Sequence, residues 1–381
     1  MSAPHLTITG AQVLRPDGMS DAPVGVADGV IADRGEGAVV NMPGCTVLPG
    51  MVDIHGDGFE RHLAPRRGAM TDMGVGLAAV EAELAANGIT TAMLAQFWSW
   101  EGGLRSPDFA LRFLEALNAY QGFGTDMRAQ LRFETHMLDD YTALHETVAR
   151  FGVGQVVFND HLPHDALNKG KRPPRLTGQA LKSGRNPDAH LAMMQGLHAR
   201  GAEVPDAVAA LAARLGAAGV ILGSHDDALP ETREWWRARG VTLSEFPETE
   251  EAAHAARAGD DGIVLGGPNV MRGNSHAGKV SARHLIGLGL CDALASDYFY
   301  PAPLRAAQIM AVEIGLERAW ALVSDGPARL LGLPDRGRIA LGLRADLVVL
   351  DRAGRVCLTM AGGRITHANG AGAAALLAAR Y

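Results

Sequence analysis

The middle of the chain, residues 51–335, alternates short apolar runs with stretches rich in Ala, Leu, Arg and Glu, such as GVGLAAVEAELAANG and PDAVAALAARLGAAG. The runs that have the character of fully buried strands cover eight segments: 51–55, 89–94, 129–135, 155–160, 219–225, 241–246, 262–268 and 292–298. Since eight strand–helix repeats close into a barrel, the pattern predicts a (β/α)₈ TIM-like barrel of the α/β class. The alternative, an open doubly wound sheet, lacks a GxGxxG motif after its first strand.

The two ends of the chain have a different pattern. Residues 5–50 and 336–366 consist of short stretches with period-two alternation, broken by Gly, Pro and Asp. Two β-rich ends around a βα middle predict one small β-sandwich built from both. We therefore expect a composite sandwich domain of residues 1–50 and 336–381, and a barrel domain of residues 51–335.

Composition narrows the classes of partner. The 381 residues are 47% hydrophobic and carry a net charge of −7, which disfavours nucleic-acid binding because that requires a clustered basic surface. Cys45, Cys291 and Cys357 are odd in number and far apart in sequence, which argues against a CxxC zinc site or a secreted disulfide framework. No signal-like start and no apolar run of the about 18 residues that a membrane helix needs are present. We expect a cytoplasmic protein without a nucleic-acid or membrane partner.

Ionisable side chains recur where the apolar runs end. They are His55, Asp57, Glu134, His136, Asp160, His161, His225, Asp226, Asp227, Glu245 and Asp297. Each alone is explained by a helix cap or a loop hydrogen bond. Together they are typical of a metal site, since the carboxyl ends of barrel strands converge on one mouth. Imidazoles and carboxylates without thiolate suit zinc, manganese or iron.

Two segments resemble the amidohydrolase superfamily. VLPGMVDIHGD (47–57) is similar to its entry strand, and GRIALGLRADLVVLD (337–351) is similar to its closing β segment. A narrower likeness comes from HGDGFERHLAPR, SHDDA, SEFPETEEAA, GGPNVMRGNSHAGK and LCDALASDYFYPAPL. These blocks resemble the PhnM family of the carbon-phosphorus lyase pathway, whose members are alpha-D-ribose 1-methylphosphonate 5-triphosphate diphosphatases. QFWSWEGGLRSP departs from the family's small-residue segment.

The resemblance implies a metal site with one or two divalent ions, zinc first and manganese or iron as alternatives. Its implied ligands are His55, Asp57, Glu134, His161, His225 and Asp297. In that scheme Glu134 bridges two metals, and Asp297 also takes the proton of the attacking water. The chain has only four lysines and none ends a strand, so a plain carboxylate must replace the carboxylated lysine of many superfamily members. His136 stays an alternative to His161.

Substrate binding is expected after the seventh strand, in GGPNVMRGNSHAGK (266–279), where barrels often place phosphate groups. The candidate residues are Arg272, Ser275, His276 and Lys279. The resemblance implies attack of water on the phosphorus nearest the ribose 5-oxygen of a ribose 5-triphosphate phosphonate, with pyrophosphate leaving. The expected partner is thus a small anionic substrate, and a homo-oligomer is possible.

Two rival functions keep the same barrel. A C-N hydrolase acting on an amide, cyclic amide or amino-heterocycle would use the same metal site, but Arg272 and Lys279 argue against a neutral substrate. A scaffold without catalysis would have lost metal ligands, whereas all six candidates are present.

Overall fold

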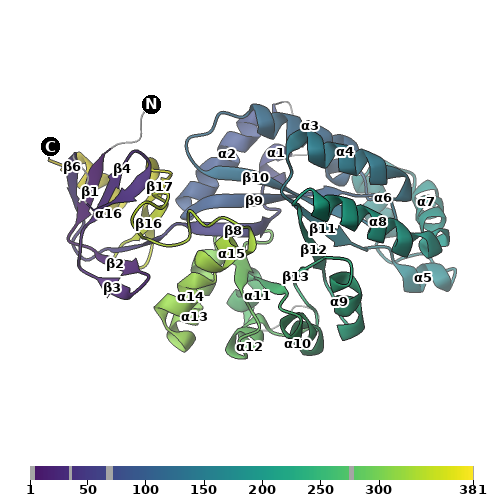
Figure 1. Cartoon of the computed structure of the whole chain (residues 1–381). Coiled ribbons are helices and arrows are strands. Elements are labelled where there is room, and N and C mark those ends of the chain that lie inside the picture. The colour runs from purple at the N-terminus through teal and green to yellow at the C-terminus, as the bar shows by residue number, and fades with distance from the viewer. Residues whose placement is uncertain (1–4, 34–36, 66–71, 274–278, 381) are drawn as a thin grey trace. The chain divides into compact units, whose positions relative to one another are not determined.

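Eight parallel strands form a nearly closed barrel in this computed structural model, which describes residues 5–33, 37–65, 72–273 and 279–380. The strands are β8 (Met51–Gly56), β9 (Ile89–Trp98), β10 (Asp126–Glu134), β11 (Gln155–Asn159), β12 (Ile221–His225), β13 (Leu243–Glu245), β14 (Gly262–Gly266) and β15 (Ala293–Ala295). They follow one another in sequence order across the sheet. The expected barrel is therefore confirmed, and each of the eight apolar runs overlaps one of its strands (Figure 1).

The first and last barrel strands meet through their ends. Gly56, the last residue of β8, forms an isolated parallel bridge with Asp297, two residues beyond β15. The barrel sheet thus begins to close beside His55, Asp57 and Asp297, which are three of the predicted metal ligands. A parallel sheet buried on both faces explains why β8 and β9 are buried at every position, and why they read as continuous apolar runs.

The chain divides into two compact units. Unit 1 comprises Met1–Leu94, Tyr120–Arg128 and Val264–Tyr381, and unit 2 comprises Ala95–Ala119 and Ala129–Ile263. The bounds of these units differ from those of the predicted domains. The barrel domain of residues 51–335 and the composite domain of residues 1–50 and 336–381 therefore stay a prediction.

Strands from both chain ends build two further sheets in unit 1. One has the order β5-β4-β1-β6 and the other the order β18-β17-β16-β7-β2-β3. Their bounds are β1 (Leu6–Thr9), β2 (Gln12–Arg15), β3 (Gly18–Ser20), β4 (Val24–Ala27), β5 (Val30–Ala32), β6 (Ala38–Asn41), β7 (Thr46–Pro49), β16 (Leu347–Leu350), β17 (Val356–Ala361) and β18 (Arg364–Ala368). The second of these sheets combines N-terminal strands, purple in Figure 1, with the yellow C-terminal strands β16, β17 and β18.

The link between the two ends is the antiparallel pair of β7 and β16, in which Leu48 lies opposite Val348. Apolar side chains from both ends share one core, which includes Ile8, Val47 and Leu347. Cys45 and Cys357, distant in sequence, also lie in that core, as free thiols. The prediction that the sandwich uses both ends of the chain is therefore confirmed.

The helices follow the strands. Unit 1 has α1 (Glu60–Leu63), α2 (Met73–Ala86), α11 (Gly267–Arg272), α12 (Ala282–Gly287), α13 (Ala302–Ile314), α14 (Leu316–Ala321), α15 (Asp325–Leu330) and α16 (Gly370–Leu377). Unit 2 has α3 (Pro107–Ala119), α4 (Tyr141–Phe151), α5 (His164–Asn168), α6 (Leu176–Lys182), α7 (Pro187–Ala199), α8 (Val204–Ala217), α9 (Pro230–Arg237) and α10 (Glu250–Ala258), with 3₁₀ turns η1 (Gly103–Arg105), η2 (Leu138–Asp140) and η3 (Gly201–Glu203).

Several helices begin at a side-chain cap. Asp72 accepts from the amides of Gly74 and Val75 at the start of α2, and Asn186 does the same for the first turn of α7, which has Pro187 at its first position. Within the described ranges, none of the helices combines the length and the apolar character needed to span a membrane.

Candidate active site and metal centre

Unit 1 places three of the predicted ligands side by side. His55 lies in β8 with no exposed surface, and Asp57 follows that strand. The amide of Asp297 donates to the carbonyl of His55 at 3.0 Å, and the amide of Asp57 donates to the carbonyl of Asp297 at 2.9 Å. Below them, the buried carboxylate of Asp53 accepts from the amide and hydroxyl of Ser296, at 2.9 and 2.6 Å. These bonds fix the backbone of all three predicted ligands.

Unit 2 places the other three together. Glu134 ends β10 with its side chain fully buried, and His161 lies two residues beyond β11. Nδ1 of His161 lies 2.5 Å from Oε1 of Glu134, and the His161 amide donates to Oε2 at 3.0 Å. The rings of His161 and His225 have centroids 6.2 Å apart. Trp100, from the segment that departs from the family pattern, donates its indole N–H to Oε2 of Glu134 at 3.2 Å.

The contact between Glu134 and His161 has an electrostatic consequence. Burial lowers the pKa of His161, but the hydrogen bond and the charge of Glu134 outweigh that effect, so the net pKa of the imidazole is raised. The two groups face each other across the proton of one hydrogen bond. A divalent ion can take the place of such a proton between an imidazole nitrogen and a carboxylate.

Arg132 determines the tautomer of His225. This arginine is 4% exposed, its guanidinium lies 4.0 Å from the centroid of the Phe97 ring, and Nη2 lies 3.0 Å from Nε2 of His225. A guanidinium can only donate, so Nε2 of His225 accepts and carries a lone pair. The carboxylate of Asp226 lies 3.1 Å from the other ring nitrogen, Nδ1. His225 is therefore held as a neutral imidazole, the form that binds metals.

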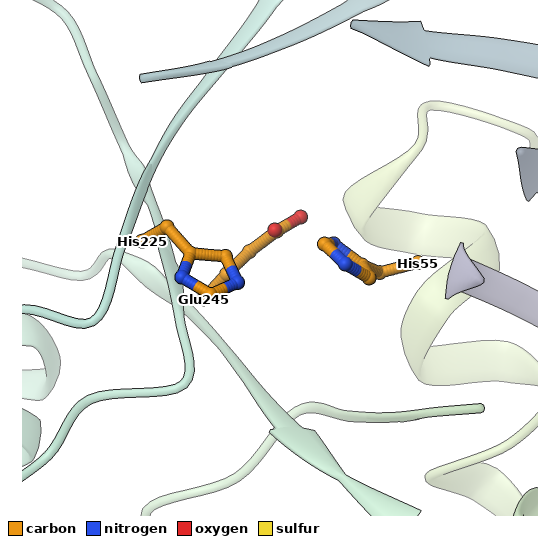
Figure 2. Close-up of side chains that lie close together, drawn as sticks. All are labelled: His55, His225 and Glu245. Carbon is orange, nitrogen blue, oxygen red and sulfur yellow. The ribbon is translucent and has the colours of Figure 1, made fainter. Parts of the chain in front are cut away.

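Two groups of side chains at the predicted ligands of unit 2 have the donor spacing of a metal site. One ligand atom of His225 lies within 4.8 Å of one of Glu245, and Figure 2 draws these two side chains together with His55. A second group with the same spacing combines His225 with His161 and Asp226. These nitrogen and oxygen donors form a candidate metal site of the kind that amidohydrolases have.

Glu245 is among the ionisable residues expected at strand ends, but it is not one of the six predicted ligands. It ends β13 with no exposed surface, and its Oε1 accepts from the side chains of Gln130 at 2.7 Å and Gln155 at 3.3 Å. Its position near the end of the apolar run 241–246 was the signal available in the sequence.

Three residues at these strand ends adopt positive φ angles without being glycine. They are Asp226 after β12 (φ 61°), Phe246 after β13 (φ 55°) and Asp297, two residues after β15 (φ 56°). Such a conformation is uncommon for Asp and a genuine outlier for Phe. Backbone strain of this kind collects at functional sites, where the surrounding structure holds it in place.

His136, the alternative to His161, lies elsewhere. Its ring belongs to a separate group with Asp160 and His164, again within 4.8 Å. Of the two histidines, His161 is the one that contacts Glu134 through its ring. The ligand and proton-acceptor roles of the six residues nevertheless stay predictions.

The expected phosphate-binding segment is described only in part. Arg272 ends α11, is exposed, donates to the hydroxyl of Tyr298 and lies 5.8 Å from the centroid of that ring. Lys279 is exposed as well. Ser275 and His276 lie outside the described residues.

Relatives with solved structures share the fold. No family model matches the chain. A putative prolidase from Bifidobacterium longum has a TM-score of 0.62 and 14% identity, with 99% of each chain covered. A beta-aspartyl dipeptidase from Fervidobacterium islandicum AW-1 has a TM-score of 0.62 and 12% identity, with 97% of this chain and 98% of that chain covered. An N-acetyl-D-glucosamine-6-phosphate deacetylase from Mycobacterium smegmatis has a TM-score of 0.58 and 19% identity, with 95% and 99% covered.

The eight-stranded barrel with imidazoles and carboxylates at its strand ends, taken with a curated relative of 32% identity, makes the chain a hydrolase of the amidohydrolase class. The chain is 32% identical, over 319 residues, to the alpha-D-ribose 1-methylphosphonate 5-triphosphate diphosphatase of Escherichia coli (strain K12), which covers 80% of this chain and 83% of that relative. It therefore belongs to the amidohydrolase superfamily and, within it, to the family of PhnM-like diphosphatases.

Proposed function

We propose that the chain hydrolyses alpha-D-ribose 1-methylphosphonate 5-triphosphate or a closely related ribose 5-triphosphate phosphonate, and releases pyrophosphate. The observation that carries this proposal is the 32% identity over 83% of the Escherichia coli diphosphatase. The reaction adds the oxygen of water to the phosphorus nearest the ribose 5-oxygen and breaks the bond from that phosphorus to the pyrophosphate group.

The residues present fit a divalent metal cofactor. We propose that His55, Asp57, Glu134, His161, His225 and Asp297 hold one or two ions, with zinc as the first candidate and manganese or iron as alternatives. Support comes from the donors, which are imidazole nitrogens and carboxylate oxygens without thiolate, and from the close approach of His225 to Glu245, His161 and Asp226 in unit 2. When bound, the metal supplies Lewis-acid activation of water at neutral pH and offsets negative charge on the phosphoryl oxygens.

Asp297 is the proposed proton acceptor. Its backbone is held by the carbonyl of His55 and the amide of Asp57, which limits where its carboxylate can be placed. In this role the carboxylate takes one proton from the attacking water, while the electron pair of the broken phosphorus–oxygen bond leaves with pyrophosphate. The lone pair on Nε2 of His225 accepts from Arg132, so a metal bound through this nitrogen would replace that hydrogen bond.

Positive charge near the seventh strand supports an anionic substrate. A triphosphate brings several negative charges to a site that already has Asp57, Glu134 and Asp297. We propose that Arg272 and Lys279, with Ser275 and His276, bind its phosphate groups. Charge-assisted hydrogen bonds from such side chains are about twice as strong as neutral ones.

The remaining proposals concern the setting of the enzyme. We expect a small anionic substrate as its ligand, no nucleic-acid or membrane partner and a cytoplasmic location, and we propose that copies of the chain can form a homo-oligomer. Light scattering of the purified protein tests the oligomer, and fractionation of its host cells tests the location.

A pyrophosphate-release assay tests the function. Purified protein is supplied with zinc, manganese or iron in turn and is given the ribose 5-triphosphate phosphonate, beside a panel of N-acyl amino acids, hydantoins and aminopyrimidines. We expect pyrophosphate from the first compound and no turnover of the panel. Hydrolysis of a nitrogen compound without any pyrophosphate release would replace the proposal with a C-N hydrolase. Elemental analysis of the same samples should give at least about half an equivalent of metal.

A further inference from the structure

Unit 2 contains a second cluster of potential metal ligands that shares no residue with the candidate site. His136 follows β10, Asp160 follows β11, and His164 begins α5. One ligand atom of each lies within 4.8 Å of the other two. Two imidazoles and one carboxylate are thus gathered at the carboxyl ends of two neighbouring strands, and none of the proposed steps of hydrolysis uses them.

The distances within this cluster are close to those of a metal site. Nδ1 of His136 lies 3.5 Å from Oδ1 of Asp160, and Nε2 of His164 lies 3.0 and 2.8 Å from the two Asp160 oxygens. Two ligands of a tetrahedral zinc ion lie about 3.3 Å apart, given bonds of roughly 2.0 to 2.1 Å. Only the contact between Asp160 and His164 must widen. The Asp160 side chain is 40% exposed, so a small rotation of its carboxylate can provide that space.

A chain of hydrogen bonds orients His164. Nε2 of His198, on α7, lies 2.9 Å from Oδ1 of Asn168, which can only accept, so this nitrogen carries the proton. Nδ1 of neutral His198 is then an acceptor, and Nδ1 of His164 donates to it at 2.8 Å. The Nε2 atom of a neutral His164 therefore presents its lone pair to the carboxylate of Asp160. Two acceptors that face each other in this way require a cation between them.

His136 indicates which cation fits. A proton between His164 and Asp160 satisfies those two groups alone. The His136 side chain is only 7% exposed, and its Nδ1, 3.5 Å from Asp160, has no hydrogen-bond partner among the residues that the structure describes. A metal ion would satisfy all three groups at once. The hydrogen bond from His164 to His198 is also the kind of outer contact that metal-binding histidines usually make.

We infer that His136, Asp160 and His164 form a second divalent-metal site, for zinc or a similar transition ion, separate from the proposed catalytic centre. Three protein ligands leave at least one coordination position for water, on the side where Asp160 and His164 are exposed. The ion connects β10 and β11 to α5 and, through His198, to α7. It therefore stabilises the segment between β11 and β12.

Zinc binding by the full-length protein tests this inference. Zinc stoichiometry and affinity are measured against a chromophoric chelator for wild type, His164→Gln, Asp160→Asn and His198→Ala. We expect His164→Gln and Asp160→Asn each to lose one equivalent of zinc relative to wild type. His198→Ala should keep that equivalent with an affinity about tenfold to a hundredfold weaker, as is usual for the loss of an outer contact.

His254→Gln is the matched control. His254 pairs with Glu250 on α10 at 3.4 Å and is exposed, but it belongs to none of the three donor groups. This variant should bind zinc as wild type does. If His164→Gln and Asp160→Asn bind as many equivalents as the control, with equal affinity, the second site does not exist. Because the comparison counts lost zinc and not turnover, failure of the proposed diphosphatase activity would leave this result unaffected.

A measurement on wild type alone covers the case in which the variants do not fold. Diethyl pyrocarbonate modifies accessible imidazoles, and the His164 and His254 side chains are 35% and 57% exposed. Peptide mass spectrometry then follows modification of each with and without zinc. We expect zinc to slow modification of His164 at least about tenfold while His254 is unchanged, since a coordinated nitrogen has no lone pair to react. Equal rates at His164 in both samples would overturn the inference.

Discussion

Asp297 combines a strained backbone with a proposed chemical role. Its φ angle of 56° lies in the left-handed region, and its amide and carbonyl are both engaged by the end of β8. Asp and Asn tolerate this region better than most residues because their short polar side chains can hydrogen-bond locally. An Asn at this position should therefore keep the backbone while it removes the charge and the basicity.

We predict that Asp297→Asn abolishes pyrophosphate release while the fold is preserved. The amide cannot accept the proton of the attacking water, and the loss of a general base costs about a hundredfold or more in rate. Turnover is measured with the ribose 5-triphosphate phosphonate, and circular dichroism checks the fold. A folded variant that retains more than about a tenth of the wild-type rate would contradict the assignment of Asp297 as the base.

We predict that Arg272→Ala and Lys279→Ala each lower kcat/KM for the triphosphate substrate by about tenfold to a thousandfold, or about 1.4 to 4 kcal/mol. Each removes a cation that offsets phosphate charge. Arg305→Ala is the matched control, because Arg305 is an exposed arginine of unit 1 that donates to Gln308. Steady-state kinetics measure kcat/KM for the three variants and for wild type. A loss in the control as large as in the other two would indicate a general charge effect.

The residues of the site could be predicted from the sequence only up to the direction of their side chains. Glu134, His136, Asp160 and His161 all stand at strand ends, so the pattern could not tell which histidine faces Glu134. That depends on the backbone beyond each strand, where His161 turns toward Glu134 and His136 toward Asp160. Glu245 was not predicted as a site residue for a related reason, since its burial depends on contacts with Gln130 and Gln155 and not on its local sequence.

At the scale of elements, α2 is attached to the segment before β10 by one buried carboxylate. Glu81, on α2, is 1% exposed and accepts from the backbone amides of Phe123, Gly124 and Thr125 at 2.8 to 3.0 Å. The hydroxyl of Tyr120 also donates to it at 2.8 Å. One side chain thus satisfies three consecutive amides in a segment that has no regular structure of its own.

We predict that Glu81→Gln lowers the free energy of unfolding by about 1.5 to 3 kcal/mol, the usual range for a hydrogen bond to a charged group. The amide NH₂ of Gln would face backbone N–H groups, which only donate. Urea denaturation measures the change. The control is Glu115→Gln, which breaks an exposed pair with Arg150 and should cost no more than about 1 kcal/mol. Equal losses in both variants would show that the amide cluster does not hold the segment.

The barrel strands could be predicted from the sequence because a buried parallel strand leaves a continuous apolar run, as β9 does. For the sheets at the chain ends, the sequence pattern predicts less about which strands pair. Their strands are three to six residues long, and β1 pairs with β6 and β2 with β7 in parallel, across intervening strands. Such pairing is decided by contacts between distant segments. Alternation alone could indicate strands there, but not their neighbours.

At the scale of the molecule, one arginine links distant parts of unit 1. Arg336 is 5% exposed and donates to Thr91 in β9 at 2.8 Å and to Asp126, at the start of β10, at 2.7 Å. It also donates to Asp335 at 2.9 Å. The barrel is thus joined to the chain segment that leads into the C-terminal strands, by a charged group that pairs with two carboxylates.

We predict that stability falls in acid through these two carboxylates. Burial raises the pKa of Asp126, but Arg128 and Arg336 outweigh it, so the net pKa is lowered; the pKa of Asp335 is lowered chiefly by its hydrogen bond from Arg336. Both carboxyl groups bind a proton more weakly in the folded chain than in the unfolded chain. Their contribution to the free energy of unfolding is therefore complete above the unfolded pKa of about 3.9 and is lost as the pH falls through the lower folded values.

Urea denaturation of wild type between pH 7 and pH 3 should show the free energy of unfolding declining from about pH 5 downward. This decline should be smaller in Arg336→Met. Arg305→Met, which removes an exposed arginine bonded to Gln308, should keep the wild-type slope. An equally steep decline in Arg336→Met would mean that other carboxylates govern the acid stability of the protein.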